Sequence, residues 1–252
     1  MAARGGGDEV STLLALSTVP AAAVLGGLTY ATAAPASTFW GENISRAPRG
    51  TAGVALTFDD GPTPGPTDHV LDALAAANVK AAFFVIGANV ERHPALLRRI
   101  HADGHLIGNH SFSHSHYTVF RRWPYWEREI RRTDEAIEKV LGVRPLLFRP
   151  PMGVKTWHTT IARKRTGHTL VTWSRRAVDG LPTTAEKILR RFAGTTAGEV
   201  LLLHDGVEPH APSPDRTATI ASVPRLIETL RAAGLPPVRL DELLKVNAYA
   251  TT

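Results

Sequence analysis

From residue 53 onward, the chain alternates short apolar runs with longer amphipathic stretches. The apolar runs, which we expect to be strands, span 53–58, 81–86, 105–109, 146–149, 168–173, 199–203 and 237–240. The amphipathic stretches, which we expect to be helices, lie near 66–77, 90–102, 124–141, 156–165, 184–193 and 219–233. Such alternation is typical of a parallel sheet with helices outside it. We therefore predict an α/β fold, a distorted and incomplete (β/α)7-type barrel that forms a single domain over residues 53–252.

The first 36 residues differ in composition from the rest of the chain. Between Ser11 and Ala36 there is no charged residue, and alanine, leucine and valine predominate. An apolar run that ends in small residues, here Ala34-Pro35-Ala36, is typical of an export signal, and this run is also long enough to span a bilayer if it is not cut. We expect an exported protein, secreted or associated with the cell envelope. Its predicted parts are a signal or membrane anchor over 1–36 and a linker over 37–52, and only the first would touch a membrane.

The chain is basic and has no cysteine. Its formal net charge is +6 and its isoelectric point is about 10.0, which suits a nucleic acid, an anionic envelope polymer or an anionic membrane surface. The basic residues lie mostly in mixed helical stretches, and no aromatic–glycine RNA signature is present, so we expect no nucleic-acid partner. Without cysteine, any metal must be held by His, Asp or Glu.

An acidic pair, Asp59-Asp60, stands where the first apolar run meets the turn Gly61-Pro62. The carboxyl ends of strands are where α/β folds build their sites. Because neighbouring strand residues point to opposite faces, we expect the two carboxylates to have different tasks, one in binding a metal and the other in moving a proton. Asp-Gly-Pro alone is also ordinary turn chemistry, so the functional interpretation depends on the other motifs.

Two histidines, His110 and His114, follow the third predicted strand. At a separation of four residues they share one face of a helical turn and can converge on one ion. Together with a strand-end aspartate they form a three-ligand set with open positions, which is typical of catalytic metal sites. Nitrogen and oxygen ligands suit zinc, cobalt, nickel or manganese.

Polar residues also end two later strands. Arg149 precedes two prolines that fix the backbone, so we expect it to pair with one of the aspartates and keep it ionised. The backbone N–H of Met152 can face a developing oxyanion. His204 can act as a general acid near neutral pH, and Asp179 can hydrogen-bond this histidine and raise its pKa.

The order of these motifs is Thr-Phe-Asp-Asp-Gly-Pro, His-Ser-x-x-His, Arg-x-Pro-x-Gly and Leu-x-His. It resembles the polysaccharide deacetylase family, carbohydrate esterase family four, whose domain is also known from the nodulation-factor deacetylase. The resemblance covers about residues 50–245 and implies a distorted barrel that removes acetyl groups from N- or O-acetylated sugars. It also implies one divalent metal ion, with zinc as the first choice and cobalt, nickel or manganese as alternatives.

The resemblance also implies a role for each matching residue. The implied site consists of the metal ligands Asp60, His110 and His114, the general base Asp59, its orienting partner Arg149, the general acid His204, the partner of that histidine Asp179, and Leu203, which shapes the acetyl pocket.

Two positions depart from the family pattern. The family often has an aromatic residue, commonly tyrosine, where this chain has Met152. A tryptophan usually follows the aspartate that here precedes Gly180-Leu181. Both changes alter the walls around the acetyl group, so they bear on substrate and rate more than on the reaction.

The leading hypothesis is a monomeric, metal-dependent enzyme that removes acetyl groups from N-acetylated glycans such as peptidoglycan or chitin-like chains. An acetylxylan esterase is the alternative with the same chemistry. A catalytically impaired glycan-binding homologue is the alternative of a different class. We expect no direct role for His116, although it lies close to the site in sequence.

Overall fold

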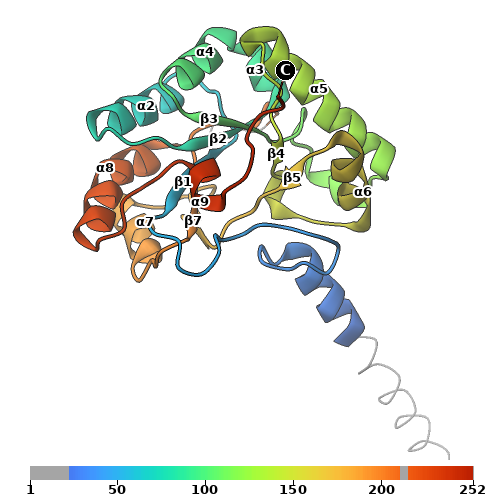
Figure 1. Cartoon of the computed structure of the whole chain (residues 1–252), viewed down its shortest axis with the longest axis horizontal. Helices are drawn as coiled ribbons and strands as arrows, with labels where there is room; N and C mark the ends of the chain where they lie inside the picture. Colours follow the sequence, from blue (N-terminus) through green and yellow to red (C-terminus); the bar gives the residue numbers. More distant parts are fainter. Residues whose placement is uncertain (1–22, 211–214, 252) are drawn as a thin grey trace, which may run out of the picture.

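The structure, a computed structural model, describes residues 23–210 and 215–251. A seven-stranded sheet with the order β5-β4-β3-β2-β1-β7-β6 lies at its centre. The strands are β1 (Ala55–Asp59), β2 (Ala82–Val85), β3 (Leu106–Asn109), β4 (Leu147–Phe148), β5 (Thr169–Leu170), β6 (Arg175–Arg176) and β7 (Val200–His204). All neighbouring strands pair in parallel. The sheet curls into a half-barrel with helices around it (Figure 1), which confirms the predicted distorted, incomplete barrel.

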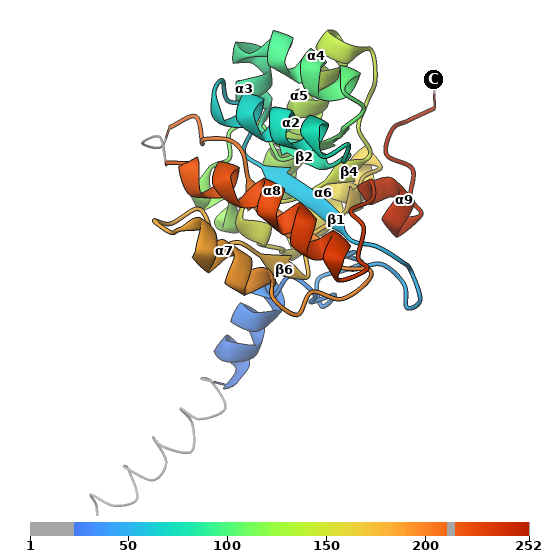
Figure 2. The ribbon, with the colours of Figure 1, turned by 90° about the vertical axis from the view of Figure 1, so that its left-hand side faces the viewer.

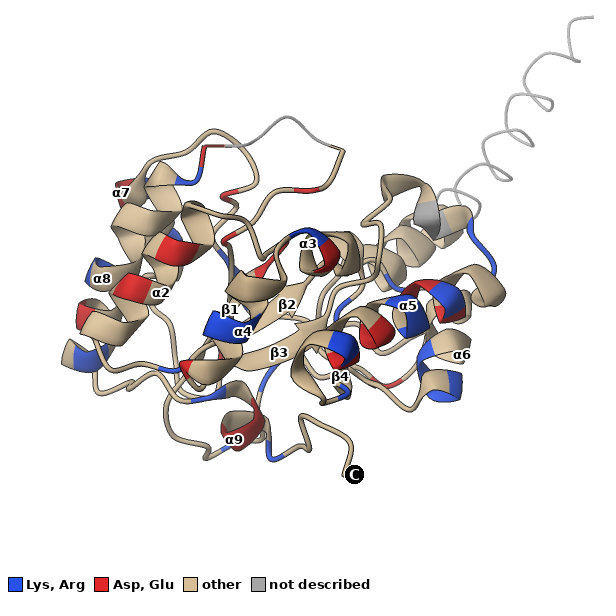
Figure 3. Ribbon diagram, turned by 90° about the horizontal axis from the view of Figure 1, so that it is seen from above, with Lys and Arg blue, Asp and Glu red and all other residues tan. Residues whose placement is uncertain are grey.

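The helices follow the predicted segments closely. They are α2 (Pro66–Ala76), α3 (Gly87–Arg92), α4 (Pro94–Ala102), α5 (Trp123–Leu141), α6 (Trp157–Thr166), α7 (Ala185–Phe192), α8 (Thr217–Ala232) and α9 (Leu240–Leu244), with 3-10 turns at His116–Phe120 and Pro151–Gly153. The predicted helix over 90–102 is in fact two helices, because His93 precedes a proline and leaves the helical region at φ −130°. Helices α2, α8 and α7 lie side by side (Figure 2), and α5 carries charges of both signs (Figure 3).

The prediction of a strand at 237–240 is wrong. Pro237 makes only an isolated bridge with Val54, and α9 begins at Leu240. Two successive prolines, Pro236 and Pro237, have no N–H to donate to a strand ladder. The seventh strand is instead β6, a two-residue arginine strand at the edge of the sheet.

The sheet is buried on both faces, as parallel sheets usually are. On its outer face Leu56 and Phe58 of β1 pack among the leucines and valines of α2, α4 and α8, and Phe58 stacks on Phe83 at 5.2 Å. On its inner face Ala55 packs with Phe84 and with the leucines of α9. Further along the inner face, β1 changes from apolar to polar residues, and its last residue there is Asp59. The polar site therefore begins where the apolar core ends.

The segment before β1 packs against the domain. Residues 23–33 are helical, and in Figure 1 this helix projects away from the barrel. After it, the buried Lys155 donates to the carbonyl oxygen of Ala34 at 2.8 Å, and the Thr172 hydroxyl donates to that of Pro35 at 2.8 Å. In the part of the chain that the structure describes, none of the helices combines the length and the apolar character that crossing a membrane requires.

Candidate active site

The carboxyl ends of the central strands surround a cavity of about 220 Å³. The strand register brings its residues together, because Asp59 of β1 lies directly opposite His204 of β7. The cavity is lined by Asp59, Asp60, His110, His114, Met152, Trp173, Gly180, Leu202, His204, Glu208 and Arg216. Residues as far apart in the sequence as Asp59 and His204 thus meet at the carboxyl end of the sheet.

Three of these residues form a possible metal site. One ligand atom of each of Asp60, His110 and His114 lies within 4.8 Å of the others. The Oδ1 atom of Asp60 lies 3.6 Å from His110 Nε2 and 3.4 Å from His114 Nε2. This oxygen is buried and accepts no hydrogen bond from the residues that the structure describes. A cation among these atoms would supply the missing partner.

The protonation state of His110 also suits a cation. The Nδ1–H of His110 donates to the carbonyl oxygen of Arg149 at 2.7 Å, which leaves Nε2 as the ligand atom. Burial, with the charge of His114, lowers the pKa of His110 to about 3, so this imidazole is neutral as a ligand must be. Burial also lowers the pKa of His114, but the carboxylates of Asp60, Glu208 and Asp59 outweigh it and raise this pKa. The residues therefore fit a divalent ion held by oxygen and nitrogen ligands.

Backbone strain is concentrated at this edge of the sheet. The φ angles of Asp60, His114 and Met152 are 76°, 48° and 56°. These values lie in the left-handed region, which residues other than glycine rarely adopt. Val178, which precedes Asp179, has a φ of 55°, and this is costlier still for a β-branched residue. Strained residues of this kind persist where the surrounding structure fixes them, and they are common at active sites.

The second carboxylate, Asp59, is held by a buried arginine. Arg149 Nη1 donates to Asp59 Oδ1 at 2.6 Å and to the Thr57 hydroxyl at 2.9 Å. The same guanidinium donates to the carbonyl oxygens of Val171 and Thr172 at 3.2 and 3.0 Å. Burial raises the pKa of Asp59 above its usual value, although the charge of Arg149 acts in the opposite direction. Arg149 thus fixes one oxygen of Asp59.

On the other side of the cavity, His204 is paired with Asp179. Its Nδ1–H donates to Asp179 Oδ1 at 2.7 Å, and its backbone N–H donates to Asp179 Oδ2 at 3.0 Å. The hydroxyl of Thr219 also donates to Oδ2, at 2.7 Å. Burial lowers the pKa of His204, but the Asp179 carboxylate, with the charges of Asp60 and Asp59, raises it to about 9. The imidazole of His204 is therefore charged at neutral pH.

The walls of the cavity differ from the prediction at one position. Leu203 is fully buried in the core on the outer face of the sheet, and Leu202 lines the cavity in its place. Neighbouring residues of a strand face opposite sides, so a shift of one residue decides which leucine reaches the cavity. Met152 lines the cavity as predicted, with 48% of its surface exposed.

Besides Leu202, sequence reasoning missed three residues that line the cavity: Trp173, Glu208 and Arg216. Arg216 is buried, donates to the carbonyl oxygen of Asp179 at 2.8 Å and lies 3.7 Å from Asp60 Oδ2. Neither Glu208 nor Arg216 ends a predicted strand, and neither has a partner at a recognisable spacing. No local pattern identified them.

Titratable groups gathered in one cavity at the carboxyl ends of parallel strands define the site of a barrel enzyme. The family profile described as polysaccharide deacetylase matches residues 46–171. The chain is 31% identical over 201 residues to a peptidoglycan-N-acetylglucosamine deacetylase of Bacillus cereus. The aligned region covers 79% of this chain and 71% of that relative. The chain therefore belongs to the polysaccharide deacetylase family of hydrolases.

Two further relatives agree with this assignment. A chitooligosaccharide deacetylase of Rhizobium leguminosarum bv. trifolii is 36% identical over 180 residues, which cover 66% of this chain and 80% of the relative. The crystal structure of the Bc1960 peptidoglycan N-acetylglucosamine deacetylase superposes with a TM-score of 0.76 at 29% identity. That match covers 82% of this chain and 95% of the solved one. The resemblance inferred from the motifs is thus confirmed.

Proposed function

We propose that this protein is an exported, metal-dependent deacetylase that hydrolyses the acetamido groups of N-acetylated glycans, with peptidoglycan or a chitin-like chain as substrate. The proposal is carried by the Asp60–His110–His114 group, which shares one cavity with a separate carboxylate, Asp59, and a separate imidazole, His204. The names of the relatives support this substrate class, since they act on peptidoglycan and on chitooligosaccharides.

Asp60, His110 and His114 would hold one divalent ion, with zinc as the first choice and cobalt, nickel or manganese as alternatives. When bound, such an ion supplies Lewis acidity toward the acetyl carbonyl and makes water more acidic. The three ligands leave coordination positions open, as catalytic sites require.

Asp59 is the proposed general base. It takes a proton from the water whose oxygen attacks the acetyl carbon. Burial raises its pKa, which makes it a stronger base than an exposed aspartate. Arg149 holds its Oδ1 atom, so Oδ2 is the oxygen that can accept the proton. The backbone N–H of Met152 is the proposed donor to the oxyanion.

His204 is the proposed general acid. Its Nε2–H gives a proton to the sugar nitrogen while the bond between that nitrogen and the acetyl carbon breaks, and the products are acetate and a free amine. This proton is needed because an amide anion is a very poor leaving group. Asp179 orients the imidazole through Nδ1 and favours its charged form. After the reaction, Asp59 releases its proton to solvent and His204 takes one up, so both groups return to their starting charges.

The size of the cavity supports a polymeric substrate. Pockets that enclose a whole drug-sized ligand measure about 300–1,000 Å³. This cavity measures about 220 Å³, so it suits one acetylated end of a sugar while the rest of the chain lies outside. Gly180 leaves its wall open, since a methyl group added there would meet no atom within 4 Å.

Export is part of the proposal. Residues 1–36 would act as a signal or as a retained anchor, residues 37–52 would link them to the catalytic domain over 53–252, and the catalytic domain would act as a monomer. Support comes from the uncharged stretch that ends at Ala36 and from relatives named for peptidoglycan, a polymer outside the membrane.

The test is acetate release from peptidoglycan, chitopentaose and acetylated xylan by the purified protein, with chelator and with metal added back. We expect release from an N-acetylated substrate that stops with chelator and returns with metal. Asp59→Asn should lose about 10²–10⁴-fold in rate, the usual contribution of a general base, and should keep its metal. Release from xylan alone would favour the esterase alternative. No release from any substrate at full metal occupancy would favour the impaired glycan-binding homologue.

A further inference from the structure

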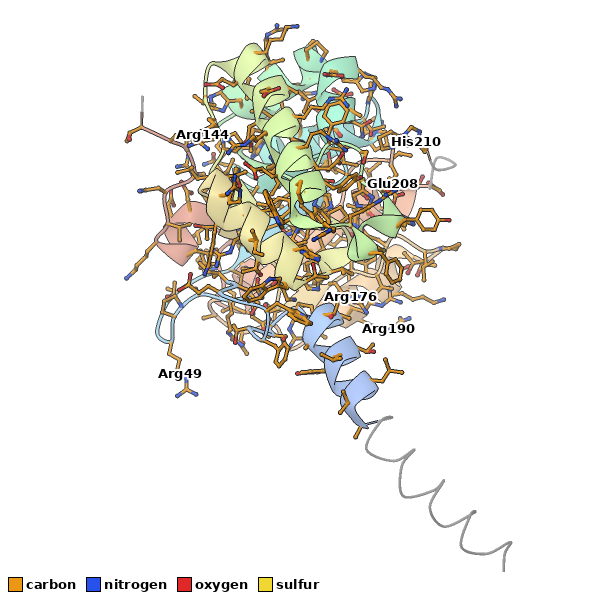
Figure 4. The ribbon with its side chains drawn as sticks, turned by 90° about the vertical axis from the view of Figure 1, so that its right-hand side faces the viewer. Arg49, Arg144, Arg176, Arg190, Glu208 and His210 are labelled. Carbon is orange, nitrogen blue, oxygen red and sulfur yellow. The ribbon has the colours of Figure 1, made fainter. Side chains whose placement is uncertain are left out.

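Glu208 occupies a position that the catalytic roles above do not explain. It lies in the loop after β7, four residues beyond His204, and it lines the catalytic cavity. It also lines a neighbouring groove of about 550 Å³ that is bordered by His116, Tyr117 and Tyr125. Figure 4 labels Glu208 beside His210 at one side of the molecule. The carboxylate thus stands where the groove meets the cavity.

This carboxylate contacts two imidazoles. Its Oε1 atom lies 3.4 Å from Nδ1 of His114, and its Oε2 atom lies 2.8 Å from Nε2 of His116. Glu208 therefore lies between a histidine of the metal group and His116.

The two histidines of the metal group differ in how their outer nitrogen is held. His110 donates from Nδ1 to a backbone carbonyl oxygen at 2.7 Å, and this fixes its ring. His114 is 5% exposed, and its Nδ1 is buried without a hydrogen-bond partner among the described residues. The acceptor that faces this nitrogen is Glu208. A histidine that binds a metal through one nitrogen almost always donates from the other, often to a carboxylate.

We propose that Glu208 is a positioning residue for the metal group. Its carboxylate accepts the Nδ1 proton of His114, which fixes Nε2 as the ligand atom and makes that nitrogen a stronger donor. Nε2 of His116 lies 2.9 Å from Oε1 and 2.8 Å from Oε2 of the same carboxylate, and this contact keeps Glu208 in place. This inference rests on the proposed metal site, and it gives His116 an indirect role that the sequence did not indicate.

A second ion between His114, His116 and Glu208 is the rival explanation, because their ligand atoms also lie within 4.8 Å of one another. That arrangement would require His114 to bind one ion through each nitrogen. A neutral imidazole has only one free lone pair, since its other nitrogen carries a proton. The positioning role needs no such deprotonation, so the chemistry of the ring favours it.

The experiment compares zinc affinity and stoichiometry among variants of the full chain, measured by competition with a chromophoric chelator. We expect Glu208→Ala to bind zinc about 10–100-fold more weakly than the parent, the usual effect of losing such a partner. Glu208→Gln should lose less zinc affinity than Glu208→Ala, because its amide oxygen can still accept the hydrogen bond from Nδ1 of His114. It should still bind zinc more weakly than the parent, because the amide carries no charge. Glu138→Ala, which removes an exposed glutamate of α5, is the matched control and should bind like the parent.

The outcomes separate the two proposals. If the parent binds no zinc, the metal site itself is refuted and the role of Glu208 falls with it. If the parent binds one zinc and Glu208→Ala binds it within twofold, the positioning role alone is refuted. Two ions in the parent and one in Glu208→Ala would make Glu208 a ligand, which also contradicts the positioning role. Equal unfolding temperatures of the metal-free parent and Glu208→Ala would show that the weaker binding is not a loss of fold.

Discussion

Replacing Asp179 by asparagine should move the alkaline limit of activity to lower pH. Both carboxylate oxygens of Asp179 are acceptors: Oδ1 faces His204 Nδ1, and Oδ2 faces the His204 backbone N–H and the Thr219 hydroxyl. An asparagine offers only one oxygen. Because the backbone N–H can only donate, we expect the amide oxygen to face it and the amide NH2 to face Nδ1. Above the ordinary pKa of a histidine, the ring would then be neutral and carry its single proton on Nε2.

The pKa of His204 gives the size of the effect. It is about 9 with Asp179 in place, against an ordinary value of 6.5. At pH 8 the charged fraction is about 90% for a pKa near 9 and about 3% for an ordinary histidine, so the rate should fall about 30-fold. At pH 6 both forms are mostly charged, and the same substitution should cost less than about twofold. A bound divalent ion lowers the pKa in both proteins, so the prediction concerns the separation between their alkaline limits.

The assay is the rate of acetate release from chitopentaose between pH 5 and 10 for the parent and Asp179→Asn, at saturating metal. Thr219→Val is the control, since it removes one hydrogen bond to Asp179 but keeps the charge beside His204. It should shift the limit much less. A loss of equal size at every pH, with no movement of the alkaline limit, would refute the claim that Asp179 sets the protonation of His204.

Two further substitutions and one truncation test how the site is supported. Arg149→Met leaves Asp59 buried without its cation and should lower the free energy of unfolding by about 3–5 kcal/mol, the range for breaking a buried ion pair; a loss below about 1 kcal/mol in urea unfolding would contradict the pairing. A chain that starts at Ser37 leaves the buried Lys155 without two of its carbonyl acceptors. Its free energy of unfolding should be about 1–3 kcal/mol lower than that of a chain that starts at Thr32, so its urea midpoint should also be lower. Equal urea midpoints would show that the hydrogen bonds of Lys155 to these carbonyl oxygens are not needed. Gly206→Ala should prevent folding or metal binding, because a Cβ there overlaps the backbone of the metal-ligand turn, and normal zinc uptake would refute this.

Gly180 is the matched control for Gly206, since both lie at the cavity end of the sheet. Its backbone does not require positive φ, and an added methyl group meets no atom within 4 Å. Gly180→Ala should change the free energy of unfolding by less than about 0.5 kcal/mol.

The strands that the sequence predicted well are those buried on both faces. β2 is a continuous apolar run, and β1 and β7 are apolar apart from Thr57 and the polar residue that ends each strand, because helices cover one side and the inner core fills the other. The failure at 237–240 has the same origin: Leu240 is buried and Val238 is partly buried there, but Pro236 and Pro237 have no N–H to donate to a strand ladder. β6 went unseen because its two arginines have neither apolar character nor alternation, and only the neighbouring strand β7 makes it a strand.

The parts of the site that form short motifs at strand ends could be predicted from the sequence. Asp60, His110 and His114 are recognisable because their residue types and spacing carry the metal-binding pattern before any fold is known. Whether Leu202 or Leu203 reaches the cavity depends on which residues of β7 point to the inner face of the sheet, and a short motif does not contain this information. Residues that reach the cavity from irregular segments have no periodic context to mark them.

The central claim is that Asp60, His110 and His114 hold one divalent ion on which catalysis depends. The most direct test is a titration of metal-free protein with zinc while acetate release from an N-acetylated glycan is followed. We predict that the rate rises to a plateau at one ion per chain, and that His110→Ala shows neither tight zinc uptake nor release. Undiminished release by metal-free protein in the presence of chelator, or by His110→Ala, would contradict the account.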